Sequence, residues 1–241
     1  MRNYGLIGKS LIHSFSPRYF RDKFNELCIN DCSYQAFELP SLGQIKALIH
    51  ENDLSGFNIT IPYKQLIIPY LDEISLIASE INSVNTVTVK NDLLCGENTD
   101  YFGFENTLLK YLQSYHKRAL IFGTGGSSKT ITYVLKSLGI ECTHVSQSNH
   151  DLMNYTQIDN DMVKSHQILI NTTPLGTFPK VDTCVDIPYS AITKNHLCYD
   201  LVYNPKESLF LAKSKLNGAM IVNGLDMLKI QADKSWKLWN G

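Results

Sequence analysis

One stretch in the middle of the chain restricts its fold more than any other. Residues 118–122 are an apolar run, and they lead directly into Gly123-Thr124-Gly125-Gly126-Ser127-Ser128. A buried strand that enters a glycine-rich turn, with a helical pattern over 127–138 behind it, is typical of a dinucleotide-binding βαβ unit. Glycines let the backbone approach the phosphates, and the helix N-terminus offers unsatisfied N–H groups. Because Ser128 replaces the third glycine, the motif alone also fits a tight turn without a ligand.

The pattern around this unit predicts a two-domain α/β protein. Apolar strands follow at 140–146, 167–171, 197–202 and 219–222, and strands that alternate with helices indicate a parallel sheet. The first hundred residues predict a separate α/β region with strands at 3–9, 33–39, 56–62, 84–90 and 93–97, and helices after Ser16 and over 42–50 and 72–81. Ser16 is expected to cap the first of these helices, with Pro17 at its first position. We therefore expect domains at 1–100 and 101–224, with the amphipathic segment 225–241 packing back on the first.

Charge and composition exclude several classes of protein. The chain has 241 residues, with 22 Lys and Arg against 23 Asp and Glu, so the net charge of −1 argues against a dedicated nucleic-acid binder. It has no apolar run near the roughly 20 residues of a membrane span, and its first residues lack the apolar core of a signal peptide. The six cysteines form no C-x-x-C pair and the histidines no H-x-x-x-H pair. We expect reduced core thiols, no metal and a cytoplasmic protein.

The end of the second strand of the βαβ unit bears on the choice of dinucleotide. This position usually holds an acidic residue for the ribose of NAD or an arginine for the 2′-phosphate of NADP. Here the sequence after His144-Val145 is Ser146-Gln147-Ser148-Asn149, which contains neither. Neutral hydrogen bonds from these side chains and a plain polar loop both fit this segment.

Three polar segments interrupt the apolar pattern of the first hundred residues. Lys64 follows the strand that carries Asn58 and Thr60, Asp100 follows Asn98-Thr99, and Asn85 lies beside Thr86. Their side chains are suited to a polar cleft. From spacing alone, a solvated lysine, an N-capping aspartate and a turn asparagine fit equally well.

Taken together, these segments resemble the shikimate dehydrogenase family over nearly the whole chain. Eight blocks occur in the order expected for that family. They are Gly8–Pro17, Gly56–Lys64, Asn82–Thr86, Gly96–Asp100, Gly123–Ser128, Asn171–Gly176, Tyr199–Pro205 and Asn223–Gln231.

The resemblance implies reversible, NADPH-dependent reduction of 3-dehydroshikimate to shikimate, a step of the shikimate pathway toward chorismate and the aromatic amino acids. It implies a catalytic pair, Lys64 and Asp100, and our hypothesis is that Lys64 is the main acid/base while Asp100 orients it. The implied substrate-binding residues are Ser14, Ser16, Asn58, Thr60, Asn85, Tyr203 and Gln231. The cofactor-binding residues are expected to be Gly123, Thr124, Gly125, Gly126, Ser127, Ser146, Gln147, Ser148, Thr172, Leu201, Gly224 and Met227. A monomer and a homodimer both remain open.

Two departures from the family pattern keep alternatives in view. The family usually has an arginine where this chain has Ser146-Gln147-Ser148, and a glycine where it has Asp226. The first leaves NAD open as a cofactor beside NADP and allows a quinate/shikimate dehydrogenase with relaxed cofactor use. A non-catalytic relative that binds cofactor or substrate, and a Rossmann-like binding module, are the other readings.

Overall fold

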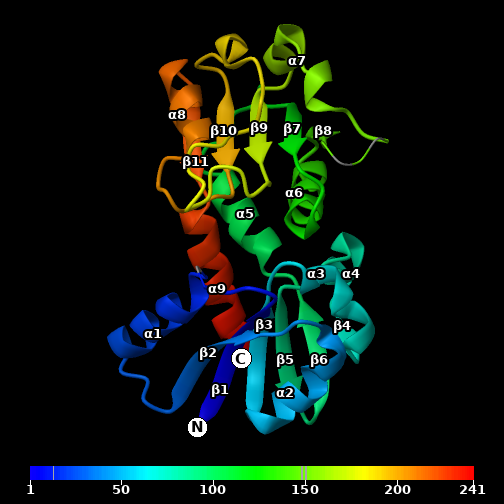
Figure 1. The fold of residues 1–241 in the computed structure, drawn as a ribbon, viewed down its shortest axis with the longest axis vertical. Coiled ribbons are helices and arrows are strands. Elements are labelled where there is room, and N and C mark those ends of the chain that lie inside the picture. The colour runs from blue at the N-terminus through cyan, green and yellow to red at the C-terminus, as the bar shows by residue number, and fades with distance from the viewer. Residues whose placement is uncertain (13, 148, 150) are drawn as a thin grey trace. The chain divides into compact units, whose positions relative to one another are not determined.

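The computed structural model describes residues 1–12, 14–147, 149 and 151–241, and these form two compact units. Unit 1 contains residues 1–102 and 229–241, and unit 2 contains residues 103–228. Each unit has its own sheet and its own helices (Figure 1). Two helices run across the boundary between the units, α5 (Asp100–Leu108) and α9 (Leu225–Trp239).

Unit 1 is built on a mixed sheet of six strands in the order β2-β1-β3-β5-β6-β4. β1, β2 and β3 run parallel to one another, β5 is antiparallel to both β3 and β6, and β4 is parallel to β6. The elements of this unit are β1 (Arg2–Gly8), α1 (Ser16–Glu26), β2 (Cys32–Glu38), α2 (Ile45–Glu51), β3 (Leu54–Ile59), α3 (Tyr63–Leu66), β4 (Glu73–Ile74), α4 (Leu76–Ile81), β5 (Thr86–Lys90) and β6 (Leu93–Glu97), with short 3₁₀ turns at Leu42–Gln44 and Ile68–Tyr70.

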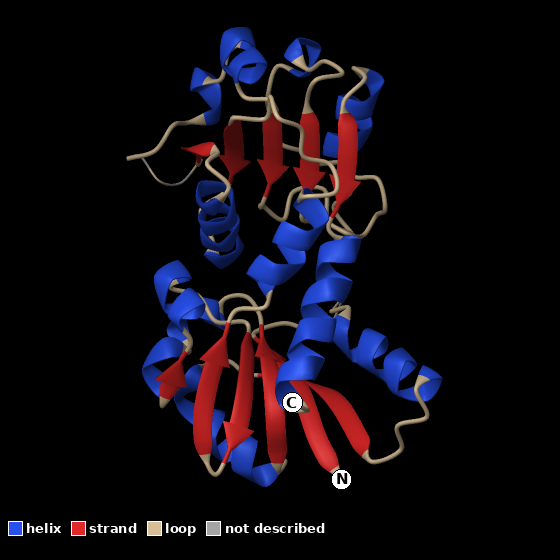
Figure 2. Ribbon diagram, turned by 180° about the vertical axis from the view of Figure 1, so that it is seen from behind, coloured by secondary structure: helices blue, strands red, loops and turns tan. Residues whose placement is uncertain are grey.

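Alternation along the strands gives this sheet two different faces. Ile7, Phe57 and Val87 belong to a core that includes Ile45 of α2. Tyr4 belongs to a second core with Phe20 of α1 and Ala232 of α9. Figures 1 and 2 show α2 on one face of the sheet and the C-terminal part of α9 on the other. Both faces are therefore covered, which fits the apolar content of β1 and β3.

Two local expectations for this region are wrong. The helix expected over 72–81 is shorter, because residues 73–74 add a short edge strand to β6 and α4 begins only at Leu76, capped by Ser75. Ser16 is the first residue of α1 rather than its cap. The cap position is Phe15, which makes no side-chain capping bond.

Unit 2 is built on a parallel sheet of five strands in the order β11-β10-β9-β7-β8. Its helices lie on both faces of this sheet (Figure 2), as expected for right-handed βαβ connections. The elements of this unit are β7 (Arg118–Phe122), α6 (Gly126–Ser137), β8 (Glu141–Val145), α7 (Asn160–Ser165), β9 (Ile168–Asn171), β10 (Leu197–Asp200), α8 (Leu209–Leu216) and β11 (Met220–Asn223), with 3₁₀ turns at Tyr155–Gln157 and Tyr189–Ala191. The predicted α/β class with a Rossmann-type parallel sheet is confirmed.

The cysteines are all free thiols, but only Cys198 is buried. The expectation that they are core residues is wrong for the exposed Cys28, which lies just after α1. Among the described residues, none of the helices is both long enough and apolar enough to cross a membrane.

Candidate active site

Strand direction brings the polar segments of unit 1 to one edge of its sheet. β1, β3 and β6 run in the same direction, so the segments that follow them leave from the same edge. Ser14 and Ser16 follow β1, Thr60 and Lys64 follow β3, and Asp100 follows β6. The antiparallel β5 begins at this edge, directly after Asn85. Sequence order alone does not reveal this convergence, because it depends on the reversal at β5.

Lys64 and Asp100 form an ion pair at this edge. The Lys64 Nζ lies 2.6 Å from the Asp100 Oδ2. Their side chains are only 14% and 9% exposed, so their attraction is screened less by water than that of a surface pair. α3 holds Lys64 in place, since the Lys64 backbone oxygen accepts a hydrogen bond from Val84 N at 2.7 Å. The capping role considered for Asp100 is not the only one available, since Asn98 Oδ1 accepts from Tyr101 N.

Asn85 ties Asp100 to helix α9. Its Nδ2 donates to Asp100 Oδ1 at 2.9 Å and lies 3.2 Å from Gln231 Oε1, while its Oδ1 accepts from Thr99 N at 2.6 Å. Asn85 is 3% and Gln231 5% exposed. The predicted residues Lys64, Asp100, Asn85 and Gln231 therefore form one connected cluster, within unit 1.

Asn58 is also near this cluster, but its amide is engaged inside the protein. Its Oδ1 accepts from the Tyr34 hydroxyl at 2.8 Å, and its Nδ2 lies 3.0 Å from Thr86 Oγ1 and 3.2 Å from Asn85 O. Burial raises the pKa of Tyr34, and a hydrogen bond with Ser16 opposes that rise. This geometry supports Asn58 as a residue that braces its neighbours, and it links Ser16 to the same network through Tyr34.

The remaining predicted substrate residues are placed less tightly. Thr60 is half-buried, and a Cβ at Gly8 would lie 2.6 Å from its Cγ2, so the ends of β1 and β3 touch. Ser14 is half-buried, and its backbone N–H donates to Leu11 O. Tyr203 belongs to unit 2, where it follows β10.

The predicted cofactor residues lie at the carboxyl edge of the parallel sheet of unit 2. β7, β9, β10 and β11 end at Phe122, Asn171, Asp200 and Asn223, and the next residues are Gly123, Thr172, Leu201 and Gly224. The chain connections change direction between β7 and β9, and ligands of open α/β sheets bind outside the strand ends at such a point. The loops meet there, because a Cβ at Gly123 would lie 2.7 Å from Thr172 Oγ1.

The glycines of the turn have different reasons to be glycine. Gly123 has a φ of +107°, which side chains rarely adopt. Gly125 has a φ of −73° and caps α6, and a Cβ placed on it would meet nothing within 4 Å. Open space beside the N-terminus of a 12-residue helix fits a dinucleotide pyrophosphate. Thr124, Gly126 and Ser127 complete this turn and are exposed or half-buried.

Ser128, at the position of the missing third glycine, points into the unit. It is 1% exposed, and its Oγ lies 3.3 Å from Nδ1 of His144 on β8. The other ring nitrogen of His144 lies 2.9 Å from Thr132 Oγ1. Burial lowers the pKa of His144, which favours the neutral ring that such a pair of hydroxyl contacts requires. A serine therefore takes the place of the third glycine by bonding to the neighbouring strand.

The segment after β8 is only partly available to a ligand. Ser146 is buried, and its Oγ accepts from Asn149 N at 3.0 Å, while Gln147 is exposed. The predicted residue Ser148 lies outside the described residues. Among the last predicted positions, Met227 is buried, and Gly224 lies so close to Leu201 O that a Cβ could not fit. Asp226 is exposed in the first turn of α9, where a carboxylate is favourable.

Two buried residues behind this edge were not among the predicted site residues. Asp200 is fully buried and accepts from Asn171 Nδ2 at 2.9 Å, Val202 N at 2.9 Å and Ser208 Oγ. Asn171 in turn accepts from Thr173 N and Thr173 Oγ1. Burial raises the pKa of Asp200 to about 6, against the effect of these hydrogen bonds. The two side chains hold together the loops that follow β9 and β10, and their place at strand ends was the available signal.

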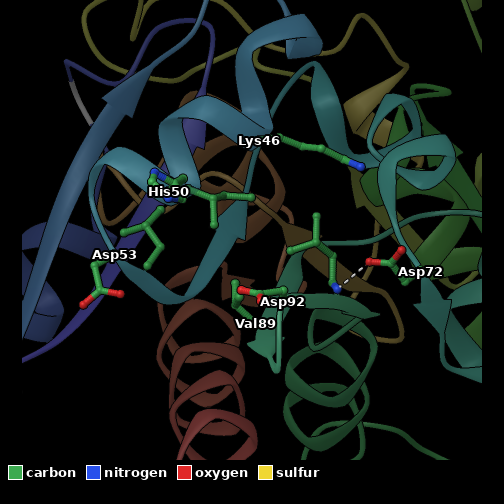
Figure 3. A pocket seen from close by; sticks show the side chains of 9 residues that line it. Lys46, His50, Asp53, Asp72, Val89 and Asp92 are labelled. Atoms are coloured by element: carbon green, nitrogen blue, oxygen red, sulfur yellow. Dashed lines mark hydrogen bonds between the residues drawn. The ribbon is translucent and has the colours of Figure 1, made fainter.

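A pocket of about 490 Å³ also lies in unit 1, lined by Lys46, Ile49, His50, Asp53, Leu54, Asp72, Val89, Asp92 and Leu94. Figure 3 shows its charged side chains around an opening between α2 and the β5–β6 hairpin, with Asp72 bonded to the backbone of Leu94. It shares no residue with the Lys64–Asp100 cluster. In the part of the chain that the structure describes, no group of three or more His, Cys, Asp or Glu side chains is arranged to hold a metal.

Comparisons with known proteins agree with this arrangement of two sites on two sheets. A family model described as the shikimate dehydrogenase substrate binding domain matches residues 6–87. A protein of Clostridium botulinum named shikimate dehydrogenase (NADP(+)) is 37% identical over 99% of this chain and 96% of its own length. The structure of shikimate dehydrogenase 1 from Peptoclostridium difficile is 34% identical with a TM-score of 0.85, covering 100% of this chain and 92% of that one. A Thermus thermophilus shikimate 5-dehydrogenase, solved in complex with NADP(H) and shikimate, is 26% identical with a TM-score of 0.87, covering 100% of this chain and 94% of that one.

Proposed function

Because this chain belongs to the shikimate dehydrogenase family, we propose that it catalyses the reversible reduction of 3-dehydroshikimate to shikimate with NADPH. The observation that carries the proposal is the 2.6 Å contact between Lys64 and Asp100 at the edge shared with Asn85 and Gln231. An ammonium group beside a carboxylate can deliver and recover a proton. The amides beside it match a substrate that is rich in hydroxyl groups.

We assign the roles of these residues by their chemistry. A bound nicotinamide supplies the hydride that reduces the ketone carbon. Lys64 donates a proton to the ketone oxygen and takes it back in the reverse direction. Asp100 keeps the Lys64 ammonium in place and accepts a hydrogen bond from a neighbouring substrate hydroxyl. Asn85, Gln231 and Thr60 bind ring hydroxyls, and Ser14 and Ser16 bind the carboxylate.

The cofactor-binding part of the proposal rests on unit 2. The N-terminus of α6, with Gly125 and Gly126, holds the pyrophosphate, and Thr172, Leu201 and Gly224 border the nicotinamide. Ser146 and Gln147 lie where the ribose of the adenosine half is bound in such units. Since free thiols are typical of reducing compartments, we also place the enzyme in the cytoplasm.

Steady-state oxidation of shikimate by the purified protein tests the proposed function. NADP⁺ and NAD⁺ are compared at matched concentrations, and quinate is offered as a second substrate. The proposal predicts turnover of shikimate that favours NADP⁺. Comparable rates with NAD⁺, or efficient quinate turnover, would identify the dual-specificity alternative that the missing arginine keeps open. Binding of NADP⁺ without turnover of either substrate would contradict an enzymatic function.

A further inference from the structure

Three buried hydroxyl groups lie behind the amides of the candidate site. They belong to Thr86 on β5, Thr99 before α5 and Ser235 on α9, and each is at most 1% exposed. The Oγ atoms are separated by 2.8 Å (Thr86–Ser235), 3.1 Å (Thr86–Thr99) and 3.1 Å (Thr99–Ser235). We refer to these three groups as the hydroxyl triangle. All three belong to unit 1, although Ser235 is separated by more than a hundred residues from the other two.

The hydroxyl triangle touches the side chains that orient the site. Thr99 Oγ1 lies 3.2 Å from Gln231 Oε1 and 3.0 Å from Asn85 Nδ2. Ser235 Oγ accepts from Asn58 Nδ2 at 3.1 Å and donates to Gln231 O, one helical turn earlier, at 3.0 Å. Each hydroxyl has one proton and can accept two hydrogen bonds, so the amide N–H groups supply the donors that the hydroxyls lack.

This pattern fixes which end of the Gln231 amide faces the triangle. Gln231 Oε1 lies near two donors, Thr99 Oγ1 and Asn85 Nδ2. Turning the amide over would set its NH₂ group against the Asn85 NH₂ group, which is unfavourable. The Gln231 nitrogen is therefore directed away from the triangle, toward the side of the site where Asn85 meets Asp100.

We propose that Ser235 is a positioning residue for the substrate-binding amides of this site. Its hydroxyl fixes the rotation of α9 against β5 and thereby aims the Gln231 amide at a hydroxyl group of the substrate. A side chain needed only for packing would require no polar atom here, and an isolated buried hydroxyl is unfavourable. The inference rests on the proposed function, since it concerns how shikimate is held.

Ser235→Ala and Ser235→Cys test this inference together. Cysteine nearly preserves the volume of serine but is a weak hydrogen-bond donor and acceptor. If the hydroxyl matters, both variants raise the KM for shikimate by about five- to tenfold, the effect of losing roughly one hydrogen bond. The KM for NADP⁺ and kcat stay within about twofold of the wild type, which a general loss of stability would not produce.

Ser214→Ala is the matched control. Ser214 is also fully buried in a helix, and its Oγ donates to Phe210 O one turn earlier at 2.8 Å, but it lies in unit 2. It should leave the KM for shikimate unchanged. A Ser235→Cys variant that matches the wild type would overturn the inference, as would equal changes in the KM for NADP⁺ and shikimate. If the wild type fails to turn over shikimate, the proposed function fails instead, so the two failures are distinguishable.

Discussion

Lys64 and Asp100 differ from the other ion pairs of the described chain in how little water reaches them. The pair formed by Arg2 and Asp31, for example, has side chains 45% and 67% exposed, and pairs of that kind contribute little to stability. A pair at 14% and 9% keeps more of its attraction and holds both groups in one geometry. Such a pair is suited to a proton transfer that must occur at one place.

Asp100→Asn tests the orienting role of this carboxylate. Asparagine keeps the size of the side chain but removes the charge that holds the Lys64 ammonium. We expect kcat for shikimate oxidation to fall by about 10²-fold, within the range of one acid/base group, while the dissociation constant for NADP⁺ is unchanged. Asp22→Asn, in an exposed surface pair, serves as the control. A kcat close to that of the wild type would show that Lys64 needs no counter-charge.

The raised pKa of Asp200 makes the stability of the protein depend on pH. The folded protein holds this proton up to a pH of about 6, whereas the usual value is 3.8, so burial disfavours the charged form. The stabilisation from the protonated form is fully present below about pH 4 and is lost as the pH rises through about 6. Compared with Asp200→Asn, the wild type should gain up to about 3 kcal/mol in its free energy of unfolding between about pH 7 and pH 4. Denaturant unfolding of both proteins measures the difference, and parallel pH profiles would contradict the assignment.

Individual site residues were predictable to different degrees. Lys64, Asp100 and Asn85 stand in short segments that match a family pattern, so the sequence suffices to propose them. Tyr34 and Ser235 stand in ordinary amphipathic segments, and nothing in their neighbours distinguishes them. Their importance follows from the register of α9 against β5, a contact across 149 positions of the chain that no local pattern contains.

Among the elements, the β7–α6 turn carries the clearest division between structural and functional residues. Gly123 cannot accept a side chain because of its positive φ and the nearby Thr172 hydroxyl. Gly125 can accept one without a clash in the free protein. The same substitution should therefore have opposite consequences at two positions of one turn.

Gly123→Ala and Gly125→Ala test this division. Gly123→Ala should lower the free energy of unfolding by about 1–3 kcal/mol, the cost of strained backbone at such a position. Gly125→Ala should leave unfolding nearly unchanged but weaken NADP⁺ binding at least about tenfold, because its methyl group takes space that the pyrophosphate needs. Thermal unfolding and titration calorimetry separate the two effects. Normal NADP⁺ affinity in Gly125→Ala would move the pyrophosphate away from this turn.

The sequence predicts long elements better than short ones. The strands and helices around residues 118–145 were expected within one or two positions, since apolar runs and glycine-rich turns define them. α3 is only four residues long and β4 only two, too short to show a period. β4 exists because it pairs with β6, and that tertiary contact is invisible in the local sequence.

For the whole molecule, the last helix belongs to the first unit. Trp239 stacks on Tyr4 with ring centroids 4.8 Å apart, and its Nε1 donates to Val87 O at 3.0 Å. A Cβ at Gly56 would lie 2.5 Å from this indole, so β3 is open at that position to accept it. The C-terminal residues thus complete the core of unit 1 while α9 also supplies Gln231 and Ser235 to the candidate site.

Trp239→Ala tests this dependence. The lost aromatic contacts and the cavity left behind should lower the free energy of unfolding by about 3 kcal/mol, near the lower end for a buried tryptophan because the ring is half-buried. The KM for shikimate should rise as well, because α9 loses its anchor four residues beyond Ser235. Leu216→Ala, at a side chain that is 87% exposed, is the control. A stability equal to that of the wild type would show that the C-terminal segment packs only loosely.

The most direct test of the catalytic assignment is kcat for shikimate oxidation with NADP⁺ in Lys64→Ala, measured beside the wild type. Loss of the single group that moves the proton should lower kcat by ~10²–10⁴-fold. The dissociation constant for NADP⁺ should not change, because the residues proposed to hold it lie in unit 2. A kcat within a few-fold of the wild type would contradict the central claim and require another proton donor in this protein.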